Sequence, residues 1–272
     1  MASLNNKTLF ITGARRGIGL AIALRAAQDG ANIAVVAKTA DPHPRLLGTM
    51  YTAAESIEKA GGQALPIATD IRFEEQVTGA VEQTVRRFGG IDILVNNASA
   101  IQLSNTKQTE LKRFDLMFHV NVRGTFLCSR LCLPHLQKSD HAHVLTMAPP
   151  ISLEAKWFAG HAVYTVSKFG MAMMTFGIAA EFSECRIAFN CLWPKTIIRT
   201  AAVAMIPGID TNQCRTPEIV ADAAYAILTK EPTQLCGQFC IDEEILKAQG
   251  TTNFDKYAVN PEIEPIPDLF VD

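Results

Sequence analysis

Tyr164 and Lys168 are the two residues of this sequence whose types and spacing best suit proton-transfer chemistry. A separation of four places both side chains on one face of a helix, one turn apart. A neighbouring ammonium group favours the phenolate, so we expect the pKa of the tyrosine to fall from about 10 towards neutrality. Such a phenol could exchange a proton with an alcohol or a carbonyl. The same pair is also common on solvated helix surfaces, so the hypothesis needs support from elsewhere.

A glycine-rich turn near the N-terminus predicts a phosphate-binding site. The apolar run Lys7–Thr12 is typical of a buried strand, and Gly13–Gly19 follows with the spacing Gly-x3-Gly-x-Gly. A helical pattern then runs from Leu20 to Gln28. Glycines let the backbone approach a pyrophosphate, and a helix N-terminus offers free N–H groups and a positive dipole. The alternative is a tight strand-to-helix turn without a ligand.

The end of the second predicted strand bears on the choice of cofactor. Residues 31–37 lead into Lys38 and Thr39, with no acidic residue for the ribose 2′-hydroxyl of NAD. A lysine and a hydroxyl suit a 2′-phosphate, and Arg15 and Arg16 in the glycine turn add positive charge. We therefore expect NADP(H) to be favoured over NAD(H). The alternative is that Lys38 is an ordinary solvated lysine at a strand end.

The elements that must position these residues alternate along the chain. This alternation predicts an α/β protein with a doubly wound parallel sheet, a Rossmann fold in a single domain over residues 1–272. Further strands are predicted at 64–70, 91–95, 142–147, 186–192 and 237–242, and helices at 51–60, 74–88, 110–133, 217–228 and around Tyr164. We expect residues 196–216 to form a lid over the substrate, and residues 246–272 to form an extended C-terminal tail.

The composition indicates a compact globular protein and argues against several other classes. Of the 272 residues, 48% are hydrophobic and 19% are charged, which suits a large core. The formal net charge of -2 provides no basic field for nucleic acid, and no apolar run is long enough to span a membrane. The seven cysteines suggest neither a disulfide framework nor a metal site. No secretory signal precedes the first strand, so we expect a cytoplasmic protein.

Taken together, the motifs resemble the short-chain dehydrogenase/reductase family. The resemblance covers about residues 5 to 245, and the matching residues stand in the family's order: Thr12-Gly13-x3-Gly17-Ile18-Gly19, Asp70, Asn96-Asn97-Ala98, Asn121, Tyr164-x3-Lys168, Asn190 and Pro194. Four short stretches resemble one subgroup, the hydroxysteroid dehydrogenase-like reductases and bacterial enzymes described as citronellol dehydrogenases: Ala37–Ala40, Pro149-Pro150, Trp157-Phe158 and Trp193–Thr196.

The resemblance implies a role for each matching residue. Tyr164 would be the general acid/base, Lys168 would hold the nicotinamide ribose and lower the pKa of Tyr164, and Asn121 would hold a water that connects Lys168 to solvent. The implied cofactor contacts are Gly13, Gly17, Ile18 and Gly19 at the pyrophosphate, Asp70 at the adenine, Asn97 and Ala98 at the adenosine ribose, and Pro194 and Ile197 at the nicotinamide.

The sequence departs from the family at the position of a catalytic serine. The family ends its fifth strand with a serine pair that polarises the substrate oxygen, whereas this chain has Ala148-Pro149. Ser152 is the nearest replacement, with an exposed loop serine as the alternative, and His161 and Lys156 are weaker substitutes. The resemblance implies an oligomer, because the family often assembles as a tetramer through its C-terminal end. We therefore expect a homodimer or homotetramer, although Glu243-Glu244 replace a usual glycine pair.

The sequence thus predicts an oxidoreductase that moves hydride between NADP(H) and a small apolar alcohol or carbonyl compound. The alternatives are an alcohol dehydrogenase that prefers NAD(H), a dehydratase or epimerase on the same scaffold, and a nucleotide-binding regulatory protein with little turnover. Several large apolar residues near the expected site favour an apolar substrate, or else belong to the ordinary core: Trp157, Phe158, Ile197, Met205 and Ile206.

Overall fold

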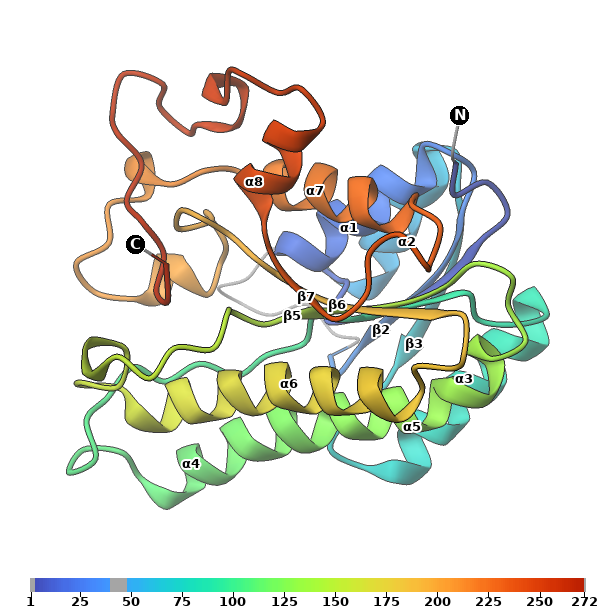
Figure 1. Cartoon of the computed structure of the whole chain (residues 1–272), viewed down its shortest axis with the longest axis horizontal. Helices are drawn as coiled ribbons and strands as arrows, with labels where there is room; N and C mark the ends of the chain where they lie inside the picture. Colours follow the sequence, from blue (N-terminus) through green and yellow to red (C-terminus); the bar gives the residue numbers. More distant parts are fainter. Residues whose placement is uncertain (1–2, 40–47, 272) are drawn as a thin grey trace.

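The centre of the computed structural model, which describes residues 3–39 and 48–271, is a seven-stranded parallel sheet (Figure 1). Its order is β3-β2-β1-β4-β5-β6-β7. The strands are β1 (Thr8–Thr12), β2 (Asn32–Ala37), β3 (Gln63–Ala68), β4 (Ile93–Asn96), β5 (Ala142–Met147), β6 (Ile187–Trp193) and β7 (Gln238–Ile241). The order reverses between β1 and β4, where doubly wound folds bind their ligands. The predicted fold class is confirmed, and Ala40 of the subgroup motif lies outside the described residues.

Helices cover both faces of the sheet, as Figure 1 shows. One face carries α1 (Gly17–Ala27), α2 (Met50–Lys59) and α7 (Glu218–Leu228), with α8 (Asp242–Ala248) packed on α7. The other carries α3 (Glu74–Phe88), α5 (Gly124–Leu136) and α6 (Ala162–Glu181), with α4 (Leu111–Met117) beside α6. Every residue of β1, β2, β5 and β6 is buried, as expected for parallel strands covered on both faces. Among the helices of the described ranges, none is long and apolar enough to cross a membrane.

Two of the predicted secondary-structure elements differ from the structure. The single helix expected over residues 110–133 is divided by a π-helical segment, Phe118–Arg123, which contains Asn121. The strand expected to reach Asp242 ends at Ile241, and the unpredicted helix α8 begins at Asp242. Three acidic residues in the first turn of α8 favour a helix start there, because carboxylates interact well with the positive helix N-terminus.

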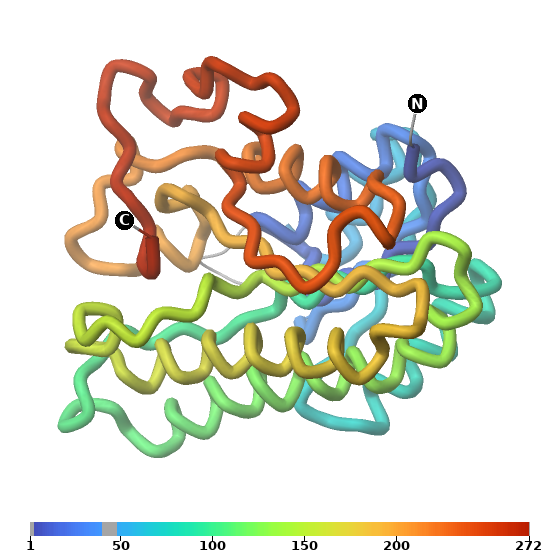
Figure 2. The backbone as a smooth tube through the Cα atoms, viewed as in Figure 1, coloured from blue at the N-terminus to red at the C-terminus, as the bar shows by residue number. Residues whose placement is uncertain are grey.

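The C-terminal tail turns back across the carboxyl edge of the sheet and runs beside the segment that follows β6 (Figures 1 and 2). Thr196 and Pro267 form an antiparallel bridge. Backbone hydrogen bonds also join Ile197 N to Ile266 O at 2.9 Å and Asp268 N to Lys195 O at 3.1 Å. Residues 266–268 therefore form a backbone-anchored edge of the molecule rather than a free end.

Candidate active site

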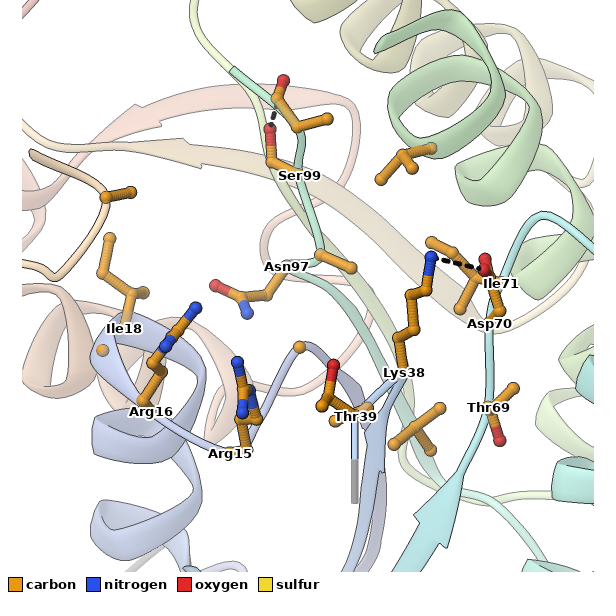
Figure 3. A pocket seen from close by; sticks show the side chains of 18 of the residues that line it. Arg15, Arg16, Ile18, Lys38, Thr39, Thr69, Asp70, Ile71, Asn97 and Ser99 are labelled. Atoms are coloured by element: carbon orange, nitrogen blue, oxygen red, sulfur yellow. Dashed lines mark hydrogen bonds and ion pairs between the residues drawn. The ribbon is translucent and has the colours of Figure 1, made fainter. Parts of the chain in front are cut away.

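The glycine turn between β1 and α1 opens into a cavity of about 510 Å³ (Figure 3). Gly13 and Gly17 have φ angles of 70° and 57°, a region that side chains rarely allow. A Cβ at Gly19 would lie 2.4 Å from Asn97 Nδ2, which itself donates to Thr12 O at 2.8 Å. The turn is thus shaped by its glycines and by Asn97. The predicted cofactor residues that line this cavity are Gly13, Arg15, Arg16, Gly17, Ile18, Lys38, Thr39, Asp70, Asn97 and Ala98.

Two guanidinium groups in the glycine turn have donors without a protein partner. The buried Nη1 atoms of Arg15 and Arg16 make no hydrogen bond to any residue that the structure describes. Burial and the charge of Arg15 lower the pKa of Arg16. Buried donors without partners are costly, whereas an anionic oxygen would satisfy them. Together with the N-terminus of α1, these arginines fit a phosphate-bearing cofactor.

Across the cavity, Lys38 faces Asp70 at the end of the neighbouring strand (Figure 3). Their Nζ and Oδ2 atoms are 3.2 Å apart, and the Lys38 side chain is 63% exposed. Asp70 also binds Arg72 at 2.6 Å, and this guanidinium lowers the pKa of Asp70 to about 2. Asp70 is therefore ionised at neutral pH, and Arg72 already balances its charge. The ion pair with Lys38 is exposed, and such a pair contributes little that would hold the Lys38 side chain in place.

The π-helical segment presents Asn121 to two other elements. Asn121 is fully buried, and its Oδ1 accepts from Ala100 N at 2.8 Å. Its Nδ2 donates to Ala100 O at 3.0 Å and to Ser167 Oγ at 2.9 Å. The amide thus ties the loop after β4 to helix α6, one residue away from Lys168. These hydrogen bonds provide the polar partners that a buried asparagine in an apolar helix needs.

Tyr164 and Lys168 lie on the inner face of α6, as their spacing predicts. Both are buried, and Lys168 Nζ donates to Met147 O and lies 5.0 Å from the centre of the Trp193 ring. Burial lowers the pKa of Lys168 to about 7. Burial and the nearby Asp268 carboxylate raise the pKa of Tyr164, so the lowered pKa expected from the sequence is wrong for this structure. Burial removes water from the charged phenolate and so favours the neutral phenol.

These two residues line a second cavity, of about 290 Å³, together with Pro194 and Ile197. The two cavities adjoin each other, because five residues line both: Ile18, Asn97, Ser99, Thr200 and Ala202. Of the predicted apolar substrate contacts, Ile197 and Ile206 line the second cavity. Met205 is 63% exposed, and Trp157 and Phe158 pack in a neighbouring aromatic cluster.

The structure does not bring Ser152 into either cavity. Its hydroxyl accepts from Glu154 N at 3.3 Å, which closes a local turn in the loop after β5. His161 and Lys156 are also absent from the residues that line the two cavities. The His161 ring lies 3.0 Å from Thr165 Oγ1, and Lys156 binds Glu154 at 3.1 Å. Of the hydroxyls proposed from the sequence, the phenol of Tyr164 alone lines the second cavity.

Sequence reasoning missed the contribution of the C-terminal tail to this cavity. Pro267, Asp268 and Leu269 line it beside Tyr164 and Lys168. It also missed Arg72, which lines the first cavity. The tail has neither helical nor strand periodicity, so no pattern places Asp268. The one available signal is the apolar run 269–271 at the end of an otherwise polar tail.

Comparisons with known proteins show what this chain is similar to. The short chain dehydrogenase family matches residues 7–207. Hydroxysteroid dehydrogenase-like protein 2 of Danio rerio is 58% identical over 266 residues, which cover 97% of this chain and 64% of that protein. A crystal structure from Xanthomonas campestris is 55% identical with a TM-score of 0.97 and covers 99% of both chains. A short chain dehydrogenase from Mycobacterium thermoresistibile is 50% identical with a TM-score of 0.94, over 99% of this chain and 96% of the other. The chain therefore spans about two thirds of the curated relative and nearly all of both solved structures.

Proposed function

The chain belongs to the short-chain dehydrogenase/reductase family of NAD(P)-dependent oxidoreductases, in the subgroup of hydroxysteroid dehydrogenase-like protein 2. From this premise we propose that it transfers hydride between NADP(H) and an apolar alcohol or carbonyl compound, with Tyr164 as the general acid/base. The observation that carries the proposal is that the two cavities adjoin each other and share five lining residues. A dinucleotide held along the glycine turn could therefore place its nicotinamide end beside the phenol of Tyr164.

The residues of the first cavity fit a dinucleotide. Gly13 and Gly17 would allow close approach of the pyrophosphate, and the buried guanidinium donors of Arg15 and Arg16 would bind its phosphate oxygens. Asp70 would contact the adenine end, and Asn97 with Ala98 the adenosine ribose. A bound nicotinamide supplies the hydride chemistry, while the protein provides position and electrostatics.

Proton transfer is assigned to the second cavity. The raised pKa keeps the Tyr164 phenol protonated at neutral pH, so it can act as an acid towards a carbonyl oxygen. Lys168, with a pKa of about 7, can restore the proton of the phenol, and Asn121 holds the backbone around it. The remaining lining is mostly apolar, which supports an apolar substrate.

The function is tested by calorimetric titration with NADPH and NADH, followed by assays with hexanal, decanal, cyclohexanone and acetophenone. We expect NADPH to bind more tightly, and its absorbance to fall when a carbonyl compound is reduced. Tighter binding of NADH would favour an NAD(H)-preferring alcohol dehydrogenase. Binding without turnover of any carbonyl or alcohol would favour a regulatory nucleotide-binding protein, and binding of neither nucleotide would refute the proposal.

Lys38→Asp should shift the cofactor preference towards NADH. The substitution removes the ammonium group that we assign to the 2′-phosphate and places a carboxylate where a 2′-hydroxyl could donate to it. Loss of one charge-assisted contact is expected to lower the NADPH/NADH affinity ratio by roughly tenfold or more. Calorimetry of both nucleotides measures this ratio, with Lys59→Asp on the exposed end of α2 as the control. An unchanged ratio in Lys38→Asp would refute the role given to Lys38.

Two further parts of the proposal concern assembly and location. The outer face of α6 exposes Val166, Met173 and Phe176, which are 45%, 61% and 55% exposed, and Phe126 on α5 is 42% exposed. Such a group of large apolar side chains suits a subunit interface, so it supports a homodimer or homotetramer. All seven cysteines are free thiols, which fits the proposed cytoplasmic location.

A further inference from the structure

Asp268 is an acidic side chain inside an otherwise apolar substrate cavity. Most residues that line the cavity of Tyr164 are apolar, and Lys168 and Asp268 are its ionisable residues besides the tyrosine. Asp268 Oδ1 accepts from the backbone N–H of Leu269 at 2.7 Å. No side chain within residues 3–39 and 48–271 forms an ion pair with it. It is costly to desolvate a carboxyl group that lines a mostly apolar cavity and has no ion-pair partner, so its presence there points to a function.

The backbone around Asp268 is held in place independently of its carboxyl group. Ile266 accepts from Ile197 N at 2.9 Å and donates to Gln213 O at 2.9 Å, and Asp268 N donates to Lys195 O at 3.1 Å. These bonds anchor the tail to the segment that forms the opposite wall of the cavity. The side chain at position 268 is therefore directed by the fold rather than by its own contacts.

Phe270 fixes the tail from the other side. It is 4% exposed, and its ring centre lies 5.3 to 6.4 Å from the rings of Trp157, His161, Tyr164, Phe169 and Trp193. Its φ angle of 71° is unfavourable for a bulky residue, so packing must hold it there. Trp193 Nε1 also donates to Leu269 O at 2.8 Å. Asp268 is thus held between two anchored points.

The other polar groups around the cavity are largely committed. Asn97 Nδ2 donates to Thr12 O, Trp193 Nε1 donates to Leu269 O, and Lys168 Nζ donates to Met147 O. Ser152 lies outside the cavity, and the hydroxyls of Ser99 and Thr200 belong to the part of the lining that is shared with the first cavity. Outside that shared part, Asp268 is the remaining lining residue whose side chain could donate a second hydrogen bond beside the phenol of Tyr164.

We propose that the carboxylic acid of Asp268 donates a hydrogen bond to the same substrate oxygen that receives the proton of Tyr164, which makes Asp268 a catalytic residue. This inference rests on the proposed function. Burial, together with the charge of Asp242, raises the pKa of Asp268 to about 7, although Lys168 opposes the shift. The acid form is therefore available near neutral pH, and its hydrogen bond stabilises the charge that develops on the oxygen.

The test is calorimetric binding of N,N-dimethyldecanamide to the complex with oxidised cofactor. This amide has a carbonyl acceptor but no N–H donor, and hydride does not reduce it, so binding is measured independently of turnover. We expect Asp268→Ala to bind it roughly five- to tenfold more weakly than the wild type at pH 6. Asp268→Asn keeps an N–H donor and should bind within a factor of about three. Glu262→Gln, an exposed change on the same tail, is the matched control.

The pH dependence distinguishes this role from a structural one. In the wild type, affinity for the amide should fall between pH 6 and 8, because an ionised Asp268 cannot donate, and in Asp268→Asn this fall should disappear. The charged or titratable groups near Asp268 are Tyr164, Lys168, Asp242 and Cys214. All four remain in Asp268→Asn, but the charge of Asp268 raises the pKa of Lys168. The pH dependence of Lys168→Met, which should keep the fall in affinity, therefore separates the titration of Asp268 from that of Lys168.

Three results would overturn the proposal: no binding of the amide by the wild type, equal affinity in Asp268→Ala, or the same pH dependence in Asp268→Asn. Failure of the proposed function would look different. In that case the wild type would bind the amide with the expected dependence on Asp268 but would turn over no carbonyl compound.

Discussion

Tyr164→Phe is expected to lose about a thousandfold in turnover, the usual scale for removal of a general acid/base, while it binds NADPH with unchanged affinity. The substitution removes the hydroxyl to which we assign proton transfer to the substrate. It keeps the ring, whose centre lies 6.3 Å from that of Phe270, so the aromatic cluster should pack as before. The loss should appear in kcat, because the proton transfer belongs to the chemical step.

Steady-state assays with the best substrate from the carbonyl screen measure this loss, and calorimetry measures NADPH affinity. Tyr51→Phe is the matched control, since Tyr51 is 56% exposed on α2 and lines neither cavity. Turnover near the wild-type rate in Tyr164→Phe would refute the assignment of the general acid/base. A parallel loss of NADPH binding would show that the hydroxyl acts in binding instead.

Lys168→Met should lower turnover by roughly a hundredfold or more and, at the same time, make the folded protein more stable at neutral pH. The first effect follows from loss of the group that restores the proton of Tyr164. The second follows from burial, because a charged ammonium group at 2% exposure is poorly solvated. Methionine has a similar length and needs no hydration, so it removes that cost.

The stability effect has a defined pH dependence. The pKa of Lys168 is about 7 in the folded chain, below its ordinary value of 10.5. Between these two values the unfolded chain binds more protons, so the free energy of unfolding rises as pH rises through this window. Since one pKa unit corresponds to about 1.36 kcal/mol, the whole rise is ~5 kcal/mol. Below pH 7 both states are charged and the contribution no longer changes.

Melting temperatures of the wild type and Lys168→Met between pH 7 and 9 test this expectation. The wild type should gain stability relative to the variant as pH increases, and the variant should melt higher at pH 7. Lys59→Met, on an exposed surface, should show neither effect. A variant that melts lower than the wild type at every pH would mean that the hydrogen bond from Lys168 to Met147 O outweighs the cost of burial.

The sequence was most informative where residue type follows directly from backbone geometry. Parallel strands that are buried on both faces must be apolar, and a turn with positive φ angles must contain glycine, so the sheet and the Gly13–Gly19 turn could be predicted. Helical spacing likewise placed Tyr164 and Lys168 on one face. The pKa direction of Tyr164 could not be predicted in this way, because it depends on how deeply the tertiary structure buries the phenol.

The other differences between prediction and structure involve contacts that no periodic sequence pattern reveals. Ser152 was the nearest hydroxyl in sequence, but a local turn with Glu154 keeps it outside the cavity. Asp268 is about a hundred residues from Tyr164 and reaches the site through backbone bonds to residues 195–197, which no periodic pattern reveals. The π-helical segment around Asn121 is accompanied by a contact with Ala100, which lies about twenty residues earlier in the sequence and follows no periodic pattern.

The packing of Phe270 makes the intrinsic tryptophan fluorescence of the protein sensitive to the position of the C-terminal tail. The chain has two tryptophans, Trp157 and Trp193, and their rings lie 5.9 and 5.8 Å from that of Phe270. The emission of both indoles therefore depends on whether this one phenyl ring is in place. Displacement of Phe270, for example by a substitution in the C-terminal tail, should therefore change the intrinsic fluorescence, which can be measured without any attached dye.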